Sequence, residues 1–186
     1  MGATSWLYFV PYQEDVEAAL QALRRDVFLR GDYAAPIDRE TMIAALQQAL
    51  RRPKCYDADL VAQWKEDLER LESIPEADPD DVEAAIGELL AVNREAGTHS
   101  ILDIRSTSST PGFGVAAPLS AAQLTQLFGT QKPMHHMVKA RRAEIEVLRD
   151  RWEATFIIVY QDGEPDEIAF IGYSGDWGNR SDTGVF

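Results

Sequence analysis

The sequence predicts an α+β protein, a single domain over residues 1–186 with about four strands packed against about six helices. Three observations support this class. The length of 186 residues and the hydrophobic content of 45% suit one sizeable globular domain. Apolar residues recur with helical spacing through much of the first half. Two strongly apolar runs near the end are separated by a polar connector, so they are expected to form an antiparallel hairpin.

The first elements are expected to be a strand and a helix. Residues 5–10 are aromatic and apolar without helical spacing, and Pro11 closes the run, which is typical of an edge strand. Over residues 14–30 the apolar side chains recur at steps of three and four, so they share one side of a helix. Gly31 is the expected stop of this helix.

Residues 37–96 are expected to form a helical lobe within the domain. Three apolar stripes follow one another here, and Pro53 and Pro75 interrupt the pattern between them. Residues 78–81 supply an N-cap side chain, a proline for the first turn and negative charge at the positive end of the last helix dipole. The stripes contain Met42, Ile43, Leu46 and Leu50, then Leu60, Val61, Trp64, Leu68 and Leu71, and finally Val82, Ile86, Leu89 and Leu90.

Beyond the lobe the sequence predicts a strand, a long loop and two helices. Residues 100–104 are the predicted strand and residues 105–119 the loop. Ser120 and Gln123 have the spacing of a capping box, so the next helix begins at Ser120. Residues 133–151 predict the longest later helix.

The last segments are two strands and a tail. Residues 156–160 and 168–173 are the predicted hairpin strands, joined by the polar connector of residues 161–167. Residues 174–186 are rich in Gly, Ser and Asp and predict a C-terminal loop or tail.

Charge is the strongest compositional signal. The chain has 31 acidic and 18 basic residues, a net charge of -13, which disfavours nucleic acid and anionic membrane as partners and attracts a basic protein. Residues 66–88 contain ten acidic residues and one basic residue. This run indicates either a solvated outer face or a docking surface for a basic partner. The residues expected to bind such a partner are Glu66, Asp67, Glu69, Glu72, Asp80, Asp81 and Glu83.

The sequence indicates a cytoplasmic protein. Its single cysteine, Cys55, cannot form an internal disulfide, and the first twelve residues lack the charged start and long apolar run of a signal peptide. No apolar stretch approaches the roughly 20 residues of a membrane helix.

The loop of residues 105–119 contains a G-x-G-x-x-A match at residues 112–117, which does not satisfy the requirements of a dinucleotide site. The turn after the predicted strand is not tight, and Pro118 lies where the helix should already be running. The next acidic residue, Glu144, is too far along to bind a ribose. No cofactor is therefore expected.

Metal and catalytic signatures are also weak. The three histidines are His99, His135 and His136, and the adjacent pair would diverge on a helix by about 100°, so no metal site is expected. There is no G-x-S-x-G elbow for a nucleophile, and the sequence favours a protein that is not an enzyme.

Two functions remain open. We favour a protein-binding module whose acidic helical surface recognises a basic protein; in size and charge alone it resembles the small immunity and antitoxin proteins that bind bacterial toxins. The alternative is an enzyme or ligand-binding protein whose site combines the loop with residues 173–179. Self-association through exposed aromatic side chains also stays open. The candidate ligand-site residues are Asp103, Ser108, Ser109, Phe113, Tyr173, Asp176 and Trp177.

Overall fold

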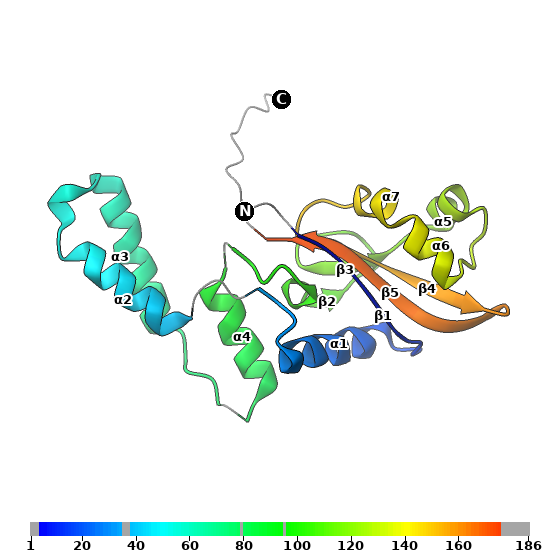
Figure 1. Ribbon diagram of the computed structural model, residues 1–186, viewed down its shortest axis with the longest axis horizontal. Helices are drawn as coiled ribbons and strands as arrows, with labels where there is room; N and C mark the ends of the chain where they lie inside the picture. Colours follow the sequence, from blue (N-terminus) through cyan, green and yellow to red (C-terminus); the bar gives the residue numbers. More distant parts are fainter. Residues whose placement is uncertain (1–3, 35–37, 79, 95, 176–186) are drawn as a thin grey trace. The chain divides into compact units, whose positions relative to one another are not determined.

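The computed structural model describes residues 4–34, 38–78, 80–94 and 96–175 (Figure 1). Within them it has five strands and seven α-helices, so the predicted α+β class is confirmed with one strand and one helix more than expected. The elements are β1 (Thr4–Pro11), α1 (Val16–Arg30), α2 (Arg39–Leu50), η1 (Pro53–Cys55), α3 (Ala58–Ser73), α4 (Val82–Val92), η2 (Ile101–Asp103), β2 (Ser106–Thr107), β3 (Val115–Pro118), α5 (Ala121–Phe128), α6 (His135–Ala140), α7 (Arg142–Glu146), β4 (Ala154–Gln161) and β5 (Glu164–Ser174).

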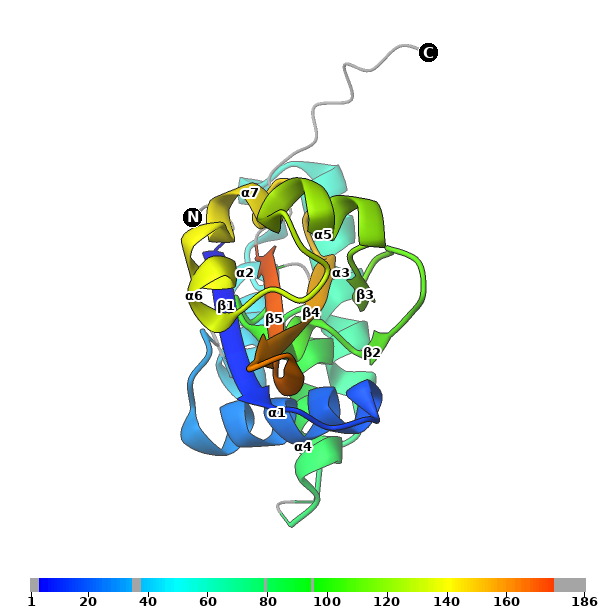
Figure 2. The ribbon, with the colours of Figure 1, turned by 90° about the vertical axis from the view of Figure 1, so that its right-hand side faces the viewer.

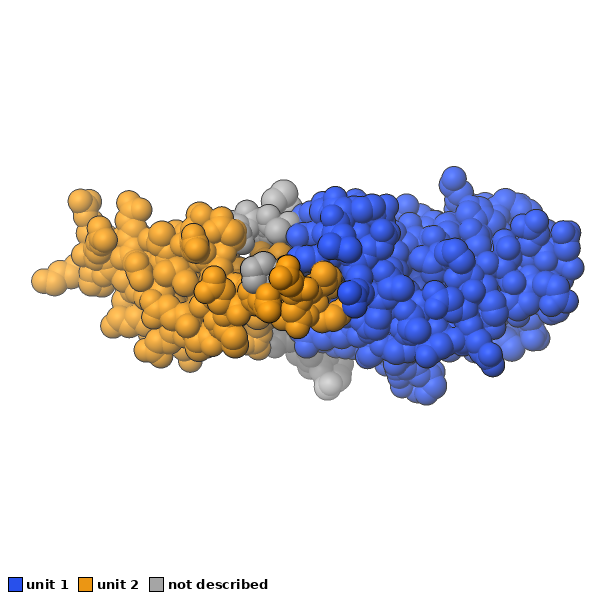
Figure 3. Space-filling view, turned by 90° about the horizontal axis from the view of Figure 1, so that it is seen from below, with its two compact units in different colours: residues 1–34, 95–186 blue, residues 35–94 orange. Residues whose placement is uncertain are grey.

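The chain divides into two compact units (Figure 3). Unit 1 comprises residues 1–34 and 95–186 and contains the sheet, α1 and α5–α7. Unit 2 comprises residues 35–94 and contains α2, α3 and α4. Unit 2 thus spans nearly the same residues as the helical lobe described above.

The sheet of unit 1 is mixed, with the order β1-β5-β4-β3-β2. The hairpin of β4 and β5 is antiparallel, as expected, and β1 is antiparallel to β5. β3 runs parallel to β4, and β2 parallel to β3. β1 and β2 are therefore the edge strands.

Helices cover both faces of the sheet (Figure 2): α5, α6 and α7 lie on one face, and α1 lies on the other. Because side chains alternate along a strand, neighbouring residues of β5 contribute to opposite faces. Ile168 and Phe170 are fully buried toward the α1 face. The core under α5–α7 consists of Leu119, Phe128, Val138, Ile145, Ile157, Val159, Ala169 and Ile171.

The predicted ends of two helices are confirmed. The start of α1 is capped by Asp15, which the sequence did not single out and whose carboxylate accepts a hydrogen bond from the Ala18 N–H. Gly31 ends α1 in the left-handed conformation with φ of 66°, which suits a residue without Cβ. Ser120 and Gln123 form the expected capping box at the start of α5.

The predicted strand at residues 100–104 is wrong. Residues 101–103 form the 3-10 turn η2, because the Ser100 hydroxyl accepts from the Leu102 N–H and the Asp103 carboxylate accepts from the Thr98 N–H. These side-chain bonds fold the run into a turn although its apolar residues are all buried. Strands β2 and β3 lie instead within the segment predicted as a loop.

The predicted helix at residues 133–151 is also wrong in extent. It is divided into α6 and α7 at Arg141, whose φ and ψ of -102° and 13° are not helical, and α7 ends at Glu146. Trp152 then has φ of 71°, a left-handed conformation that turns the chain into β4.

Candidate functional site

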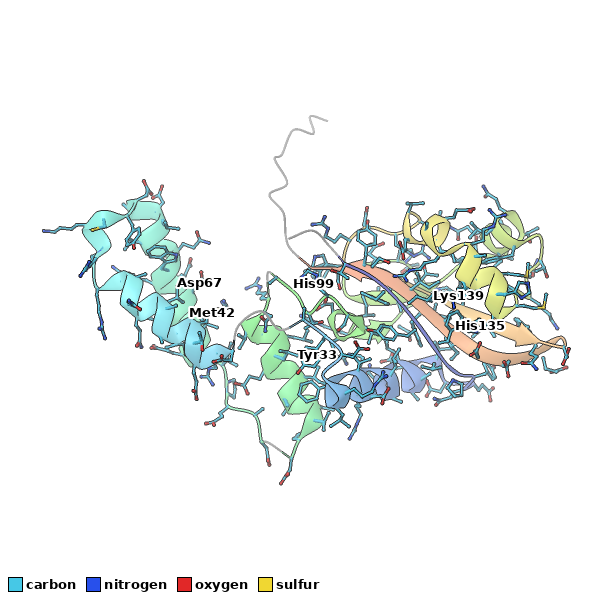
Figure 4. The ribbon with its side chains drawn as sticks, in the orientation of Figure 1. Tyr33, Met42, Asp67, His99, His135 and Lys139 are labelled. Atoms are coloured by element: carbon cyan, nitrogen blue, oxygen red, sulfur yellow. The ribbon has the colours of Figure 1, made fainter. Side chains whose placement is uncertain are left out.

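The seven acidic residues expected to bind a partner all belong to unit 2. Four lie on α3, two directly before α4 and one in the first turn of α4. All except Asp67 are exposed. Figure 4 labels Asp67 on α3 and Met42 on the neighbouring helix α2. The remaining residues of the set are Glu66, Glu69, Glu72, Asp80, Asp81 and Glu83.

Some of these carboxylates have local structural roles. Asp81 caps α4 by accepting from the N–H groups of Glu83 and Ala84. Asp67 lies 3.3 Å from the Arg70 guanidinium. Glu66 and Glu69 have no hydrogen-bond donor or cation within reach in the described ranges, so their charges face solvent uncompensated.

Helices α2 and α3 form a hairpin that buries little of its own apolar surface. Among its helical residues only Leu71 is buried. The rest of both apolar stripes is half-buried or exposed, including Leu60 at 38%. Tyr56 is 46% exposed and meets the Trp64 ring edge-on, with ring centroids 4.8 Å apart. The hairpin therefore presents exposed aromatic surface, and α3 carries the uncompensated carboxylates of Glu66 and Glu69 on a different side of the helix from Trp64.

Two arginines hold unit 2 together. Arg39 on α2 donates through Nε to the Leu71 carbonyl at 3.0 Å and lies 3.6 Å from the Glu88 carboxylate on α4. Arg70 on α3 donates to the carbonyl of Ala91 at 2.9 Å. These cations neutralise part of the acid and connect all three helices of the unit.

A second region, in unit 1, brings together Asp103, Phe113 and Tyr173 around Trp152. The Phe113 ring stacks on Trp152 with centroids 5.7 Å apart, and the backbone N–H of Trp152 donates to the Tyr173 carbonyl at 3.1 Å. Gly97 lies so close that a Cβ there would be 2.4 Å from Trp152 Cη2 and 3.1 Å from Asp103 Oδ2. Trp152 directly follows the helix predicted over residues 133–151, and the sequence did not single out this central residue.

Asp103 is the most unusual side chain of this region. It is only 4% exposed, and Oδ1 accepts from the Thr98 N–H at 2.8 Å and the Thr98 hydroxyl at 3.0 Å. Oδ2 is buried without a hydrogen-bond donor among the described residues. An unsatisfied buried carboxylate oxygen costs free energy, so Oδ2 can accept a further donor.

The other predicted ligand-site residues are not joined to Asp103. Ser108 pairs through its N–H with the Ala116 carbonyl, and its hydroxyl accepts from the Thr110 N–H. Ser109 is exposed on the connector between β2 and β3. Asp176 and Trp177 lie outside the described residues, as does most of the predicted tail, whereas Ser174 ends β5.

The start of the 105–119 segment is fixed to α1 by Glu17, which the sequence did not single out. The carboxylate accepts from the Thr107 N–H at 2.6 Å and from the Thr107 hydroxyl at 2.8 Å, and Gln21 donates to it. Partial burial raises the pKa of Glu17, but the hydrogen bonds from Gln21 and Thr107 outweigh it and leave the pKa lowered.

The histidines make separate contacts (Figure 4). His99 Nδ1 lies 3.0 Å from the Thr4 hydroxyl. His135 stacks on Phe9 with centroids 3.9 Å apart, and its Nδ1 is 2.7 Å from Glu167. Over the residues that the structure describes, no three His, Cys, Asp or Glu side chains converge in a way that could hold a metal ion.

No helix in the described ranges is both long and apolar enough to cross a membrane. The chain matches no protein-family model, no curated protein and no solved structure at a level that shows a relationship.

Proposed function

We propose that the protein is a binding module for a basic protein and that the α2/α3 hairpin is its docking surface. The observation that supports this function best is the low burial of the hairpin, in which Leu71 is the one buried helical residue. Protein interfaces combine a desolvated apolar centre, rich in Trp, Tyr and Met, with a charged rim. The hairpin offers both parts.

The apolar centre of the proposed surface is the Tyr56 and Trp64 pair. Aromatic side chains of this kind supply large contact area with few rotatable bonds and are enriched among the residues that dominate binding energy. Tyr56 is 46% exposed, so much of its ring is available to a partner.

The charged rim consists of the exposed carboxylates on α3, led by Glu66 and Glu69. Their field attracts a basic protein over a Debye length of about 8 Å at physiological salt, and it repels acidic proteins. The rim therefore supplies selectivity and association rate, and the aromatic centre supplies most of the affinity.

The test begins with capture of binding proteins at low salt on the immobilised chain. Each captured protein is then purified, and its affinity is measured by titration calorimetry against the native chain and Glu66→Gln/Glu69→Gln. Two exposed charge contacts are together worth about 0.4–2 kcal/mol, so the variant should bind roughly 2- to 30-fold more weakly. Affinity for the native chain should fall as salt rises.

The matched control is Glu14→Gln/Glu164→Gln, which removes two exposed carboxylates of unit 1 and leaves the same net charge. It should bind like the native chain. Tyr56→Ala should weaken binding and leave the salt dependence unchanged. The proposal fails if no basic protein binds at low salt, or if the control loses as much affinity as the hairpin variant.

A second candidate function rests on the unsatisfied Oδ2 of Asp103 beside Trp152 and Phe113. A carboxylate next to aromatic rings suits a small ligand with a cationic nitrogen, which donates to the oxygen and lies over a ring face. Titration with methylguanidinium and methylammonium, followed by the NMR shifts of the Trp152 indole, tests this site. Asp103→Asn should abolish saturable shifts, and equal shifts in the variant would exclude the site.

A further inference from the structure

Strand β1 forms an edge of the sheet, and no strand among the described residues pairs with its outer side. In the order β1-β5-β4-β3-β2 its one strand neighbour is β5. The two strands pair without a register shift from Thr4, opposite Ser174, to Pro11, opposite Glu167. An uninterrupted edge of eight residues carries a row of unpaired N–H and C=O groups.

Two hydrogen bonds fix which backbone groups point outward. The Tyr12 N–H donates to the Asp166 carbonyl at 2.9 Å, so the even-numbered residues of β1 direct their backbone groups at β5. The backbone N–H of Trp152 donates to the Tyr173 carbonyl at 3.1 Å, on the β4 side of β5. Odd-numbered residues of β5 therefore direct their backbone groups at β4 and even-numbered residues direct theirs at β1, in agreement with the alternation in β1. Ser5, Leu7 and Phe9 therefore point their backbone N–H and C=O groups out of the sheet.

In the part of the chain that the structure describes, these outward groups have no hydrogen-bond partner. The usual devices that protect an edge strand are nearly absent from β1. It carries no charged residue and no bulge, and only Pro11, at its end, lacks an outward N–H.

We infer that β1 pairs with β1 of a second copy of this chain, antiparallel and centred on Leu7, to form a continuous ten-stranded sheet. In this register Leu7 faces Leu7 of the second copy, and Ser5 faces Phe9. All three outward N–H groups of each copy then reach a carbonyl, giving about six hydrogen bonds across the seam. A register shifted two residues toward the C-terminus would keep about six hydrogen bonds but place Pro11 opposite Ser5, so the Ser5 carbonyl of each copy would face a residue without an N–H.

The side chains around the seam are compatible with a second copy in spite of the net charge of -13. Near Ser5, Arg142 and Glu146 form an ion pair at 2.7 Å. Near Phe9, His135 faces Glu167 at 2.7 Å. The two-fold symmetry brings the Arg142–Glu146 pair of one copy toward the His135–Glu167 pair of the other, so the Arg142 guanidinium of each copy approaches Glu167 of the other. Long-range repulsion between the copies remains, and salt should screen it.

This surface is on unit 1 and does not depend on the hairpin proposed to bind a basic protein. Salt distinguishes the two interactions, because added salt should strengthen self-association and weaken the binding of a basic partner. Either proposal can fail while the other holds.

The first experiment is amide exchange of the native chain, followed by NMR at several protein concentrations. At low concentration the Ser5, Leu7 and Phe9 amides should exchange fast, while those of Trp6 and Tyr8 are protected by β5. Raising the concentration should slow the three outward amides alone, in parallel with a rise in mass by sedimentation equilibrium.

The second experiment is cysteine cross-linking in a Cys55→Ser background. Facing residues of a hydrogen-bonded pair have Cα atoms about 5.5 Å apart, within disulfide range. Leu7→Cys should therefore form a disulfide dimer alone. Ser5→Cys and Phe9→Cys should cross-link with each other when mixed and not separately, because identical positions lie about 13 Å apart along the strand.

The oxidation rate of the native chain through its exposed Cys55 gives the rate of cross-linking by random collision. The facing pairs should oxidise on the order of tenfold faster or more, because pairing raises the effective concentration of the thiols. The inference is overturned if the chain stays monomeric with fast outward amides at every concentration, or if Ser5→Cys cross-links with itself as fast as with Phe9→Cys. Protection of the outward amides only by a different protein would overturn it as well.

Discussion

Replacing Gly172 by alanine should destabilise unit 1, because the Trp6 ring lies across this glycine. A Cβ at Gly172 would be 2.6 Å from Trp6 Cζ2, 2.7 Å from Cη2 and 3.1 Å from the Glu153 carbonyl oxygen. Trp6 is 5% exposed and donates through Nε1 to the Ser174 hydroxyl at 3.2 Å, so it cannot move without breaking a buried contact.

The expected cost follows from this overlap. Overpacking a closely packed core by one methyl group costs about 1–3 kcal/mol. A central figure of about 2 kcal/mol lowers the melting temperature of a chain of this size by about 4–8 °C. Urea unfolding followed by far-UV circular dichroism measures the change in the free energy of unfolding.

A double-mutant cycle with Trp6→Phe tests the cause. Phenylalanine is shorter than the indole and vacates the space that the new methyl group needs, although Trp6→Phe alone loses the bond to Ser174 and some buried area. Gly172→Ala should then cost about 1 kcal/mol less in the Trp6→Phe background than in the native chain. If the two changes add to within about 0.5 kcal/mol, the overlap with Trp6 is not the source of the destabilisation.

Three further substitutions separate other contributions. Gly87→Ala, in the interior of α4 with nothing within 4 Å of the new methyl group, should raise the free energy of unfolding by up to about 1 kcal/mol in the same urea assay. Because folding lowers the pKa of Glu17 below its ordinary 4.5, ionised Glu17 stabilises the fold at neutral pH, and this contribution is lost as pH falls through the lowered value. Glu17→Gln should thus be less stable than the native chain at pH 7, and the difference should shrink below pH 4.5 in urea titrations at a series of pH values; a constant difference would contradict this. Arg39→Met keeps the aliphatic stem and removes the bonds to α3 and α4, so it should cost about 1–2 kcal/mol and speed amide exchange in unit 2 while unit 1 is unchanged.

Where local chemistry decides the structure, the sequence was sufficient. The C-terminal end of α1 follows from the conformational freedom of Gly31, which acts within a few residues. The capping box at Ser120 is local in the same sense. The β4/β5 hairpin also follows from neighbouring residues, since two apolar runs flank a polar connector.

Where distant residues decide, the sequence was not sufficient. The turn at residues 101–103 is a local exception: Ile101, Leu102 and Ile104 are buried and apolar, as they would be in a strand, and the short-range hydrogen bonds of Thr98 and Ser100 that favour the turn were not anticipated. Strand β3 exists because it pairs in parallel with β4, which is far along the chain. Trp152 was not predicted as a site residue for the same reason, because its place beside Asp103 depends on contacts with Gly97 and Phe113, which are distant in the sequence.

The bond between Ala34 and Thr98 has a consequence for how this chain can change. The Ala34 N–H donates to the Thr98 carbonyl at 2.9 Å. The chain therefore leaves unit 1 and re-enters it at neighbouring points, and unit 2 lies between them in the sequence. Closing such a loop costs little more when the loop is long than when it is short. The sheet therefore tolerates an insertion of almost any length at this junction, and a short glycine linker could replace unit 2. Selection can alter, exchange or remove the acidic insert without reworking the scaffold that carries it.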